Sequence, residues 1–151
     1  MLYLVDVTEE NWLELAALKV REEQKHFLAT ALGILARGYV YRNCNARVFG
    51  ISKDNQMIGM ALIRDFLDAP VGYDLQQFMI DARFQNMGYG TEALKMILQF
   101  LKKEARYGHV EVCVNNKDRQ AIHVYEKVGF IDSGYVDEAL PDYINMIYHF
   151  V

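Results

Sequence analysis

The stretch QNMGYG, residues 85–90, lies between a run rich in β-forming residues, 74–80, and an amphipathic segment, 89–106. This order predicts a strand, a glycine-containing turn and a long helix. The first backbone N–H groups of a helix have no partner within it, and the helix dipole favours negative charge at the same end. Because Gly88 and Gly90 have no Cβ atom to block close approach, the loop is a candidate site for a phosphate or pyrophosphate group.

Three kinds of loop carry glycines in this arrangement, and two of them fit poorly here. Residues 88–93 match the dinucleotide pattern G-x-G-x-x-A, and Glu111 lies near the position where an acidic ribose ligand is sought. The first glycine, however, comes eight positions after Ile80, and the roughly sixty residues after the loop are too few for a second mononucleotide-binding half. A Walker loop needs a Lys after Gly90, which the chain lacks. A tight turn that uses its glycines for packing stays open on these residues alone.

The elements outside the loop predict one mixed α/β domain over residues 1–151. We expect strands at 2–7, 46–52, 56–64, 74–80, 109–114, 130–136 and 143–150. We expect helices at 9–18 with Thr8 as N-cap, at 22–36 with Gly38 as the end, at 89–106 and at 118–127. Residues 53–55 should form the turn of a hairpin. The predicted fold is a twisted, mostly antiparallel sheet of about seven strands flanked by about four helices.

Composition and charge exclude several classes of function. The chain has 151 residues, a size typical of one domain, and a formal net charge of −4, which disfavours a nucleic-acid partner. The apolar run at 57–63 is too short to cross a bilayer, and no signal peptide is recognisable at the N-terminus. Cys44 and Cys113 have no paired spacing and predict free thiols in a reducing compartment. We therefore expect a cytoplasmic protein without a nucleic-acid, membrane or metal partner.

Two motifs resemble the signatures of one enzyme family. Gln85, Gly88 and Gly90 match the pattern Q/R-x-x-G-x-G/A of the GNAT superfamily of acyl-CoA-dependent N-acetyltransferases. Residues 114–130, VNNKDRQAIHVYEKVGF, resemble the C-terminal signature of the same superfamily. The positions that fall in register there are Ala121, Tyr125, Glu126, Gly129 and Phe130. The motifs occur in the expected order and the resemblance covers most of the chain, so it implies the GNAT fold and acetyl-CoA as the cosubstrate.

The resemblance also implies which residues hold acetyl-CoA. They are Phe78, Met79, Ile80, Gln85, Asn86, Met87, Gly88, Tyr89, Gly90, Thr91, Asn115, Asp118, Ala121 and Tyr125. The backbone of 78–80 would pair with the pantetheine arm, and the amides of 86–91 would bind the pyrophosphate. Asp118 stands where the family often has Asn, so either it or Asn115 would contact the pantetheine; Asp118 is also a good N-cap for the next helix. Tyr125 occupies the general-acid position, from which a phenol can protonate the departing thiolate.

The resemblance implies direct transfer of the acetyl group to an amine, whose deprotonation needs a base, a desolvating pocket or water. The candidate bases are Asp74, Asp81, Glu111, His109, His123 and His149. The acidic residues that suggest a cationic acceptor are Asp132, Asp137, Glu138 and Asp142 in the tail and Glu9, Glu10, Glu14, Glu22 and Glu23 near the start. Residues 20–27, 78–81 and 144–148 are similar to bacterial polyamine acetyltransferases.

A polyamine such as spermidine is therefore the acceptor that we expect. The alternatives are an aminoglycoside, a protein N-terminus or lysine, and a non-catalytic role as an acyl-CoA sensor, because a fold does not fix a function. Cys113 has no motif for a base beside it, and we interpret it as a packing residue. The tail strand is rich in Tyr and Ile and is a candidate edge for a homodimer.

Overall fold

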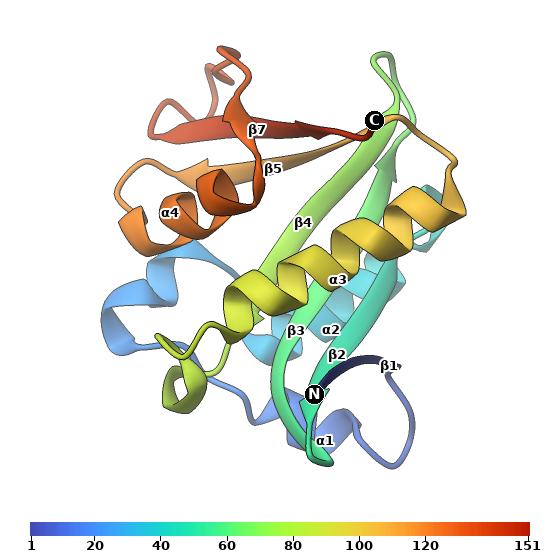
Figure 1. Ribbon diagram of the computed structural model, residues 1–151, viewed down its shortest axis with the longest axis vertical. Helices are drawn as coiled ribbons and strands as arrows, with labels where there is room; N and C mark the ends of the chain where they lie inside the picture. The colour runs from blue at the N-terminus through green and yellow to red at the C-terminus, as the bar shows by residue number, and fades with distance from the viewer.

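The hairpin around Asp54 and Asn55 forms as predicted in the computed structural model, which describes residues 1–151. Both residues have positive φ, 49° and 63°, as a two-residue hairpin turn requires. The turn joins β2 (Arg47–Lys53) to β3 (Gln56–Phe66). These two antiparallel strands form part of the sheet on which the other elements are arranged (Figure 1).

The sheet has seven strands in the order β1-β2-β3-β4-β5-β7-β6. The remaining strands are β1 (Leu2–Asp6), β4 (Gly72–Ile80), β5 (His109–Asn115), β6 (Ile131–Asp132) and β7 (Tyr143–His149). All neighbouring strands pair antiparallel except β4 and β5, which are parallel. The predicted fold class and the mostly antiparallel, seven-stranded sheet are thereby confirmed.

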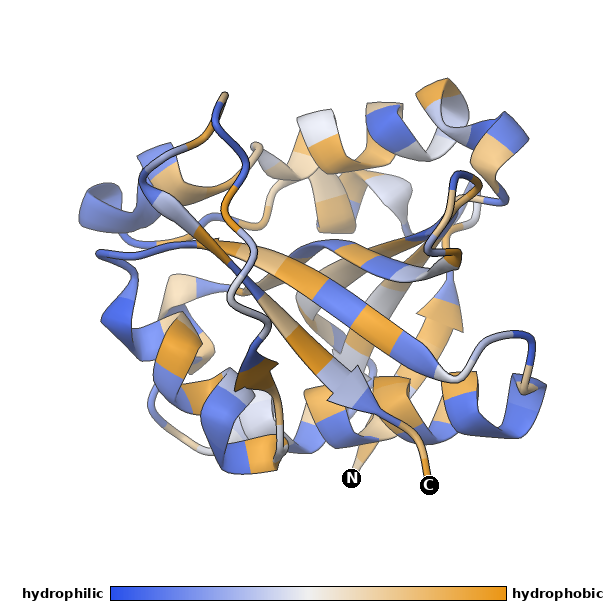
Figure 2. Cartoon of the chain, turned by 90° about the horizontal axis from the view of Figure 1, so that it is seen from above, coloured by the Kyte–Doolittle hydropathy of each residue, from blue (hydrophilic) through white to orange (hydrophobic).

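Helices cover both faces of the sheet (Figures 1 and 2). They are α1 (Trp12–Ala16), α2 (Ala31–Val40), α3 (Tyr89–Glu104) and α4 (Arg119–Val128), with short 3-10 helices η1 (Glu22–Phe27), η2 (Arg42–Cys44) and η3 (Ala82–Phe84). Successive side chains of β3 point to opposite faces of the sheet, so the strand contributes to a hydrophobic core on each face. Ala61 and Ile63 pack with α3 and α4, whereas Met60 and Leu62 pack with α1 and α2. None of the helices combines the length and the apolar character that a membrane span requires.

The parallel pairing of β4 with β5 is confined to two residue pairs, Tyr73 with Val110 and Asp74 with Glu111. Beyond them the two strands diverge (Figure 1). A bulge lies at this point, because Gln76 has no opposite residue on β3. The last residues of β4 therefore pair only with β3, and their other edge faces a gap in the sheet.

The predicted helix over 22–36 is wrong, because the segment divides into η1 and α2. The hydroxyl of Thr30 accepts a hydrogen bond from the N–H of Gly33 at 3.0 Å and caps a new helix. Gly38 does not end that helix but lies inside it. A Cβ atom at Gly38 would come within 2.7 Å of Val48 Cγ2, so the glycine allows α2 to approach β2 closely.

Three further expectations need correction. Thr8 does not cap the first helix: α1 starts only at Trp12, and the backbone N–H of Thr8 donates to Asn11 Oδ1 in the turn before it. The strand predicted over 130–136 is reduced to β6, because Gly134, with φ of 80°, turns the chain away after Asp132. The long helix ends slightly earlier than predicted, at Ala105, which has a left-handed conformation.

Candidate active site

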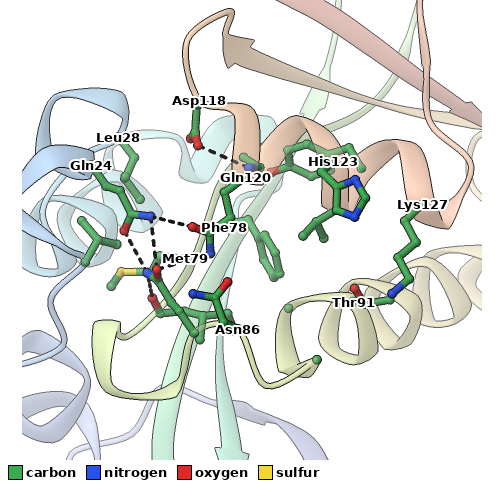
Figure 3. Close-up of a pocket in the computed structure, with 18 residues that line it drawn as sticks. Gln24, Leu28, Phe78, Met79, Asn86, Thr91, Asp118, Gln120, His123 and Lys127 are labelled. Atoms are coloured by element: carbon green, nitrogen blue, oxygen red, sulfur yellow. Dashed lines mark hydrogen bonds between the residues drawn. The ribbon is translucent and has the colours of Figure 1, made fainter.

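The end of β4, the glycine loop, the start of α3 and one face of α4 surround a cavity of about 270 Å³ (Figure 3). It lies where β4 and β5 have diverged, so the bulged strand and the gap in the sheet together create the space. Residues Val20, Gln24 and Leu28, from the segment around η1, form a further wall. The cavity thus brings together three parts of the chain that are far apart in the sequence.

Most of the predicted acetyl-CoA residues line this cavity. They are Phe78, Met79, Ile80, Gln85, Asn86, Gly88, Gly90, Thr91, Asp118, Ala121 and Tyr125. Three predicted residues do not line it: the side chain of Met87 is exposed, the ring of Tyr89 lies beside Lys53, and Asn115 accepts a hydrogen bond from the N–H of Lys117. Between Asn115 and Asp118, only Asp118 therefore borders the cavity.

The glycine loop presents a row of free backbone donors. The first helical bond of α3 runs from the N–H of Glu92 to the carbonyl of Gly88, and the N–H groups of residues 86–91 donate to no group in the chain. Gly88 has φ of 85°, and no atom lies within 4 Å of the place where a Cβ would stand. At Gly90 a Cβ would meet only Ile80 Cγ1, at 3.8 Å. Unpaired donors around open space fit an anionic group such as the pyrophosphate of coenzyme A.

Tyr125 lies at the inner end of the cavity, with its side chain held by aromatic neighbours. Its ring centroid is 6.4 Å from that of Phe78 and 5.4 Å from that of Phe130, and the residue is only 5% exposed. Its hydroxyl makes no hydrogen bond within the chain, although the cavity gives it access to a ligand. Burial, and to a smaller extent the charge of Asp118, raises the pKa of Tyr125 above its ordinary value. The phenol therefore stays protonated at neutral pH.

Helix α4 is fixed at both ends by the residues that the motif supplies. A carboxylate oxygen of Asp118 accepts from the N–H of Ala121 at 3.3 Å, which confirms its interpretation as an N-cap. Gly129, with φ of 115°, ends the helix. Burial raises the pKa of the Asp118 carboxyl even though the Ala121 bond opposes this. The two caps determine how far Tyr125 projects toward the cavity.

The candidate bases differ in the hydrogen bonds and ion pairs that they already form. Asp81 accepts from the N–H of Lys19 at 3.0 Å, from the N–H of Arg83 at 3.0 Å and from Arg83 Nε at 2.8 Å. Burial alone raises the pKa of Asp81, but these bonds outweigh burial and lower it. Asp81 is thus occupied with fixing the turn after β4. Asp74 is paired with Arg64 at 2.8 Å, while burial raises its pKa.

Glu111 lies opposite Asp74 on the neighbouring strand, and neither of them lines the cavity. His109 and His149 are register partners on β5 and β7, also away from it. Of the histidines considered, only His123 lines the cavity. No group of three or more His, Cys, Asp or Glu side chains is placed to hold a metal ion.

Several residues that line the cavity were not predicted as site residues. They are Val20, Gln24, Leu28, Gln120, Val124 and Lys127. The helical spacing of Gln120, Val124 and Lys127 along α4 places them on one face, and this periodicity is a signal that could have found them. The wall from the η1 segment has no periodic signal of this kind. Its likeness to polyamine acetyltransferases over 20–27 marks the segment, but its contact with the glycine loop depends on the tertiary structure.

The fold and this site define an acetyl-CoA-dependent N-acetyltransferase. The chain belongs to the Acetyltransferase (GNAT) family, whose model matches residues 5–130. The predicted enzyme class and the predicted cosubstrate are confirmed by this membership. The chain is also 23% identical over 141 residues to the spermine/spermidine N(1)-acetyltransferase of Bacillus subtilis (strain 168), covering 87% of this chain and 88% of that protein.

Solved structures share the fold at low sequence identity. The acetyltransferase from Agrobacterium tumefaciens str. C58 has a TM-score of 0.76 and 14% identity, covering 98% of this chain and 90% of that chain. The spermidine N-acetyltransferase from Vibrio cholerae, in complex with CoA and spermine, has a TM-score of 0.73 and 15% identity, covering 98% and 95%. At these identities the likeness shows the fold alone.

Proposed function

We propose that this enzyme transfers the acetyl group of acetyl-CoA directly to a primary amine of a small cationic acceptor, with a polyamine such as spermidine as the preferred substrate. The observation that carries the proposal is the cavity itself, which is lined both by residues of the loop with free backbone donors, Asn86, Gly88, Gly90 and Thr91, and by Tyr125 with its unbonded hydroxyl. Acetyl-CoA supplies an acetyl group activated as a thioester. The residues of the chain bind it, orient it and manage the protons.

The glycine loop is proposed to bind the pyrophosphate through the free N–H groups of residues 86–91. The edge of residues 78–80 that faces the gap in the sheet has no strand beside it, so its backbone groups are available to the pantetheine arm. A backbone N–H near Ile80 would polarise the carbonyl of the thioester. Lys127 borders the cavity and forms no ion pair in the chain, so it offers a positive charge to the phosphates.

Tyr125 is proposed as the general acid. The raised pKa of its phenol keeps the proton on the oxygen over the physiological pH range, so the hydroxyl can donate to the sulfur as the thiolate leaves. The acceptor enters as an ammonium ion and loses two protons, one before it attacks the carbonyl and one as the C–S bond breaks. Tyr125 gives its own proton to the thiolate and recovers one from solvent, so that the net products are the amide, the free thiol and one proton. Because Asp81 is already bonded three times, the proton of the amine is proposed to pass to water or to a carboxylate outside the cavity.

Acidic groups beside the gap in the sheet support a cationic acceptor. Glu111 and Asp74 are opposite each other where β4 and β5 part, and only Asp74 has a basic partner. Burial first, and then the charges of Asp74 and Asp137, raise the pKa of the Cys113 thiol, so carboxylates from β4 and from the β6–β7 loop both act on this part of β5. An excess of negative charge attracts a polyamine and disfavours anionic acceptors.

The free edge of β7 supports a homodimer as a second part of the proposal. β6 pairs with β7 only at Ile147 and Met146, and Ser133 donates to the carbonyl of Asn145 at 2.8 Å, so the remaining positions of that edge of β7 have no strand beside them. Exposed edges of this kind are sites for pairing with another chain. Sedimentation that gives a monomer at micromolar concentration would exclude the dimer.

The function is tested by thiol release from acetyl-CoA with a panel of acceptors: spermidine, an aminoglycoside, and a peptide with a free N-terminus and a lysine. We expect spermidine to give the highest kcat/KM. A higher value for the peptide or the aminoglycoside would contradict the polyamine proposal. The absence of thiol release with every acceptor, despite tight binding of coenzyme A, would instead favour a sensor.

The acidic acceptor side is tested by Glu111→Gln, with Glu10→Gln in the exposed turn before α1 as the matched control. We expect the KM for spermidine to rise by up to about fivefold in Glu111→Gln, because an exposed charge pair contributes little in water. The KM for acetyl-CoA should not change. An unchanged KM for spermidine would mean that the acceptor does not bind beside Glu111.

A further inference from the structure

Three glutamine side chains from distant parts of the chain meet at one wall of the cavity (Figure 3). Gln24 lies in η1, Gln85 begins the glycine loop and Gln120 lies in the first turn of α4. Gln24 Nε2 donates to Gln85 Oε1 at 3.1 Å and to Gln120 Oε1 at 3.3 Å, and Gln85 Nε2 donates back to Gln24 Oε1 at 2.9 Å. We call these three side chains the amide clasp.

Gln24 and Gln85 use their full hydrogen-bonding capacity in and around the clasp. The side-chain oxygen of Gln24 also accepts from the N–H of Arg21 at 3.0 Å, and Gln85 Nε2 also donates to the carbonyl of Ile80 at 2.9 Å. The oxygen of Gln85 accepts in addition from Gln120 Nε2 at 3.4 Å. A primary amide has two donors and two acceptor sites, so these bonds hold both side chains in one orientation.

The segment that carries Gln24 lacks a core of its own. η1 buries none of its residues; Val20 and Leu28 at its borders line the cavity and pack against the core beside α1 and α2. Short helices gain most of their stability from packing an apolar face, which this one does not do. The clasp instead attaches the segment to the glycine loop through Gln85 and to α4 through Gln120.

We propose that Gln24 is a positioning residue for the cosubstrate, which through the amide clasp fixes the glycine loop in its binding shape and holds residues 20–28 as the outer wall of the cavity. This inference rests on the proposed role of the loop in binding acetyl-CoA. Gln85 connects the two effects, because it bonds both Gln24 and the carbonyl at the end of β4. Removing the Gln24 amide leaves Gln85 short of a donor and of an acceptor, and the loop gains alternative conformations.

The test compares the dissociation constant of coenzyme A, measured by calorimetry, in the wild type, Gln24→Ala and Gln77→Ala. Gln77 Oε1 accepts from the N–H of Ala29 at 3.0 Å, so its loss loosens the same segment without touching the glycine loop. We expect the dissociation constant to rise about tenfold in Gln24→Ala and less than about twofold in Gln77→Ala. Gln120→Ala removes the third member of the clasp and should give a rise of about threefold. If Gln24→Ala does not fold, Gln120→Ala carries the same comparison.

Hydrogen exchange gives a second readout that a general loss of stability would not produce. We expect coenzyme A to slow exchange at residues 21–28 in the wild type and in Gln77→Ala, and to leave it fast in Gln24→Ala. Equal affinities in the wild type and Gln24→Ala, or equal losses in Gln24→Ala and Gln77→Ala, would overturn the clasp. A wild type that does not bind coenzyme A would overturn the proposed function instead.

Discussion

The two ends of α3 differ in how their polar groups are satisfied. At the N-terminal end, the backbone N–H groups of residues 86–91 have no partner in the chain, and the hydroxyl of Tyr125 opens unbonded into the same cavity. At the C-terminal end, Arg106 donates to both oxygens of Asp65 at 2.8 Å. Glu104 accepts there from the hydroxyl of Tyr73 at 3.0 Å and from Arg106 Nε at 3.1 Å.

The pKa values follow the same division. Burial raises the pKa of Glu104, but hydrogen bonds from Arg47, Arg106 and Tyr73 outweigh burial and lower it. The pKa of Arg106 is raised, chiefly by its hydrogen bond to Asp65. At Tyr125, by contrast, burial acts without any compensating bond. The free amides leave the N-terminal end, the unpaired end, available to a ligand. The C-terminal end, the paired end, is engaged in side-chain bonds that stabilise the fold, although Arg47 Nε there has no partner.

The largest effect is expected from Tyr125→Phe. Removing the phenol that is proposed to protonate the thiolate should lower kcat by roughly 10²- to 10⁴-fold, the usual contribution of general acid catalysis. Affinity for coenzyme A should stay within about twofold, because the ring still packs between Phe78 and Phe130. The measurement is steady-state kinetics with saturating acetyl-CoA. The exposed Tyr135→Phe is the control, and full turnover in Tyr125→Phe would show that another group protonates the thiolate.

A smaller effect is expected from Gly90→Val, which fills the space in front of the free amides. A Cβ at this position meets only Ile80 Cγ1, at 3.8 Å, so we expect folding to be preserved while the pyrophosphate is displaced. We expect the dissociation constant of coenzyme A to rise about a hundredfold, as for a misplacement of about 1 Å. Gly108→Val is the matched control, since a Cβ there meets no atom within 4 Å and the residue does not line the cavity. Equal affinity in both variants would refute the loop assignment.

The paired end is tested by Asp65→Asn, which should act on stability and not on binding. Asp65 is 4% exposed and bonded twice by Arg106, so its loss is expected to lower the free energy of unfolding by about 2 kcal/mol. Urea denaturation measures this change. Affinity for coenzyme A should be unchanged at temperatures where the variant is folded. A loss of affinity comparable to that of Gly90→Val would show that the two ends of α3 are coupled.

The smallest effect is expected at alkaline pH, where kcat should show no fall between pH 8 and 10. A raised pKa means that the protonated phenol of Tyr125 persists above its ordinary value near 10, so no activity is lost through its ionisation in this range. A pH profile at saturating substrates measures it. A fall with a midpoint below pH 10 that is missing in Tyr125→Phe would mean that the phenol is more acidic than its surroundings imply.

The sequence predicted the elements whose signals are local. Gly88 and Gly90, the hairpin turn at 53–55 and the apolar spacing of α3 depend on neighbouring residues, and all three features form as expected. The helix over 22–36 was wrong because Leu28, Leu32 and Leu35 keep helical spacing across the break that Thr30 introduces. The strand at 130–136 was too long because apolar residues continue beyond Gly134, where the backbone has already turned.

The site shows the same limit. The residues of the two motifs were placed in advance, and most of them meet at the cavity. Gln24 and Gln120 are 96 positions apart, and no pattern in the sequence joins them. Their contact depends on how η1 lies against α4, which only the tertiary structure determines. The same holds for the hydroxyl of Tyr125, because the spacing of residues in a sequence does not show whether a side chain has a hydrogen-bond partner.

The short parallel contact between β4 and β5 has a thermodynamic consequence. Only two residue pairs connect the four-stranded and the three-stranded parts of the sheet by backbone pairing, so part of the edge of β4 and of β5 lacks a neighbouring strand. A molecule lying in the gap would act as a removable internal strand, and its binding energy would add to the stability of the folded state. At a hundred times its dissociation constant, such a ligand contributes about 2.7 kcal/mol. The thermal stability of this enzyme would then increase with the concentration of acetyl-CoA.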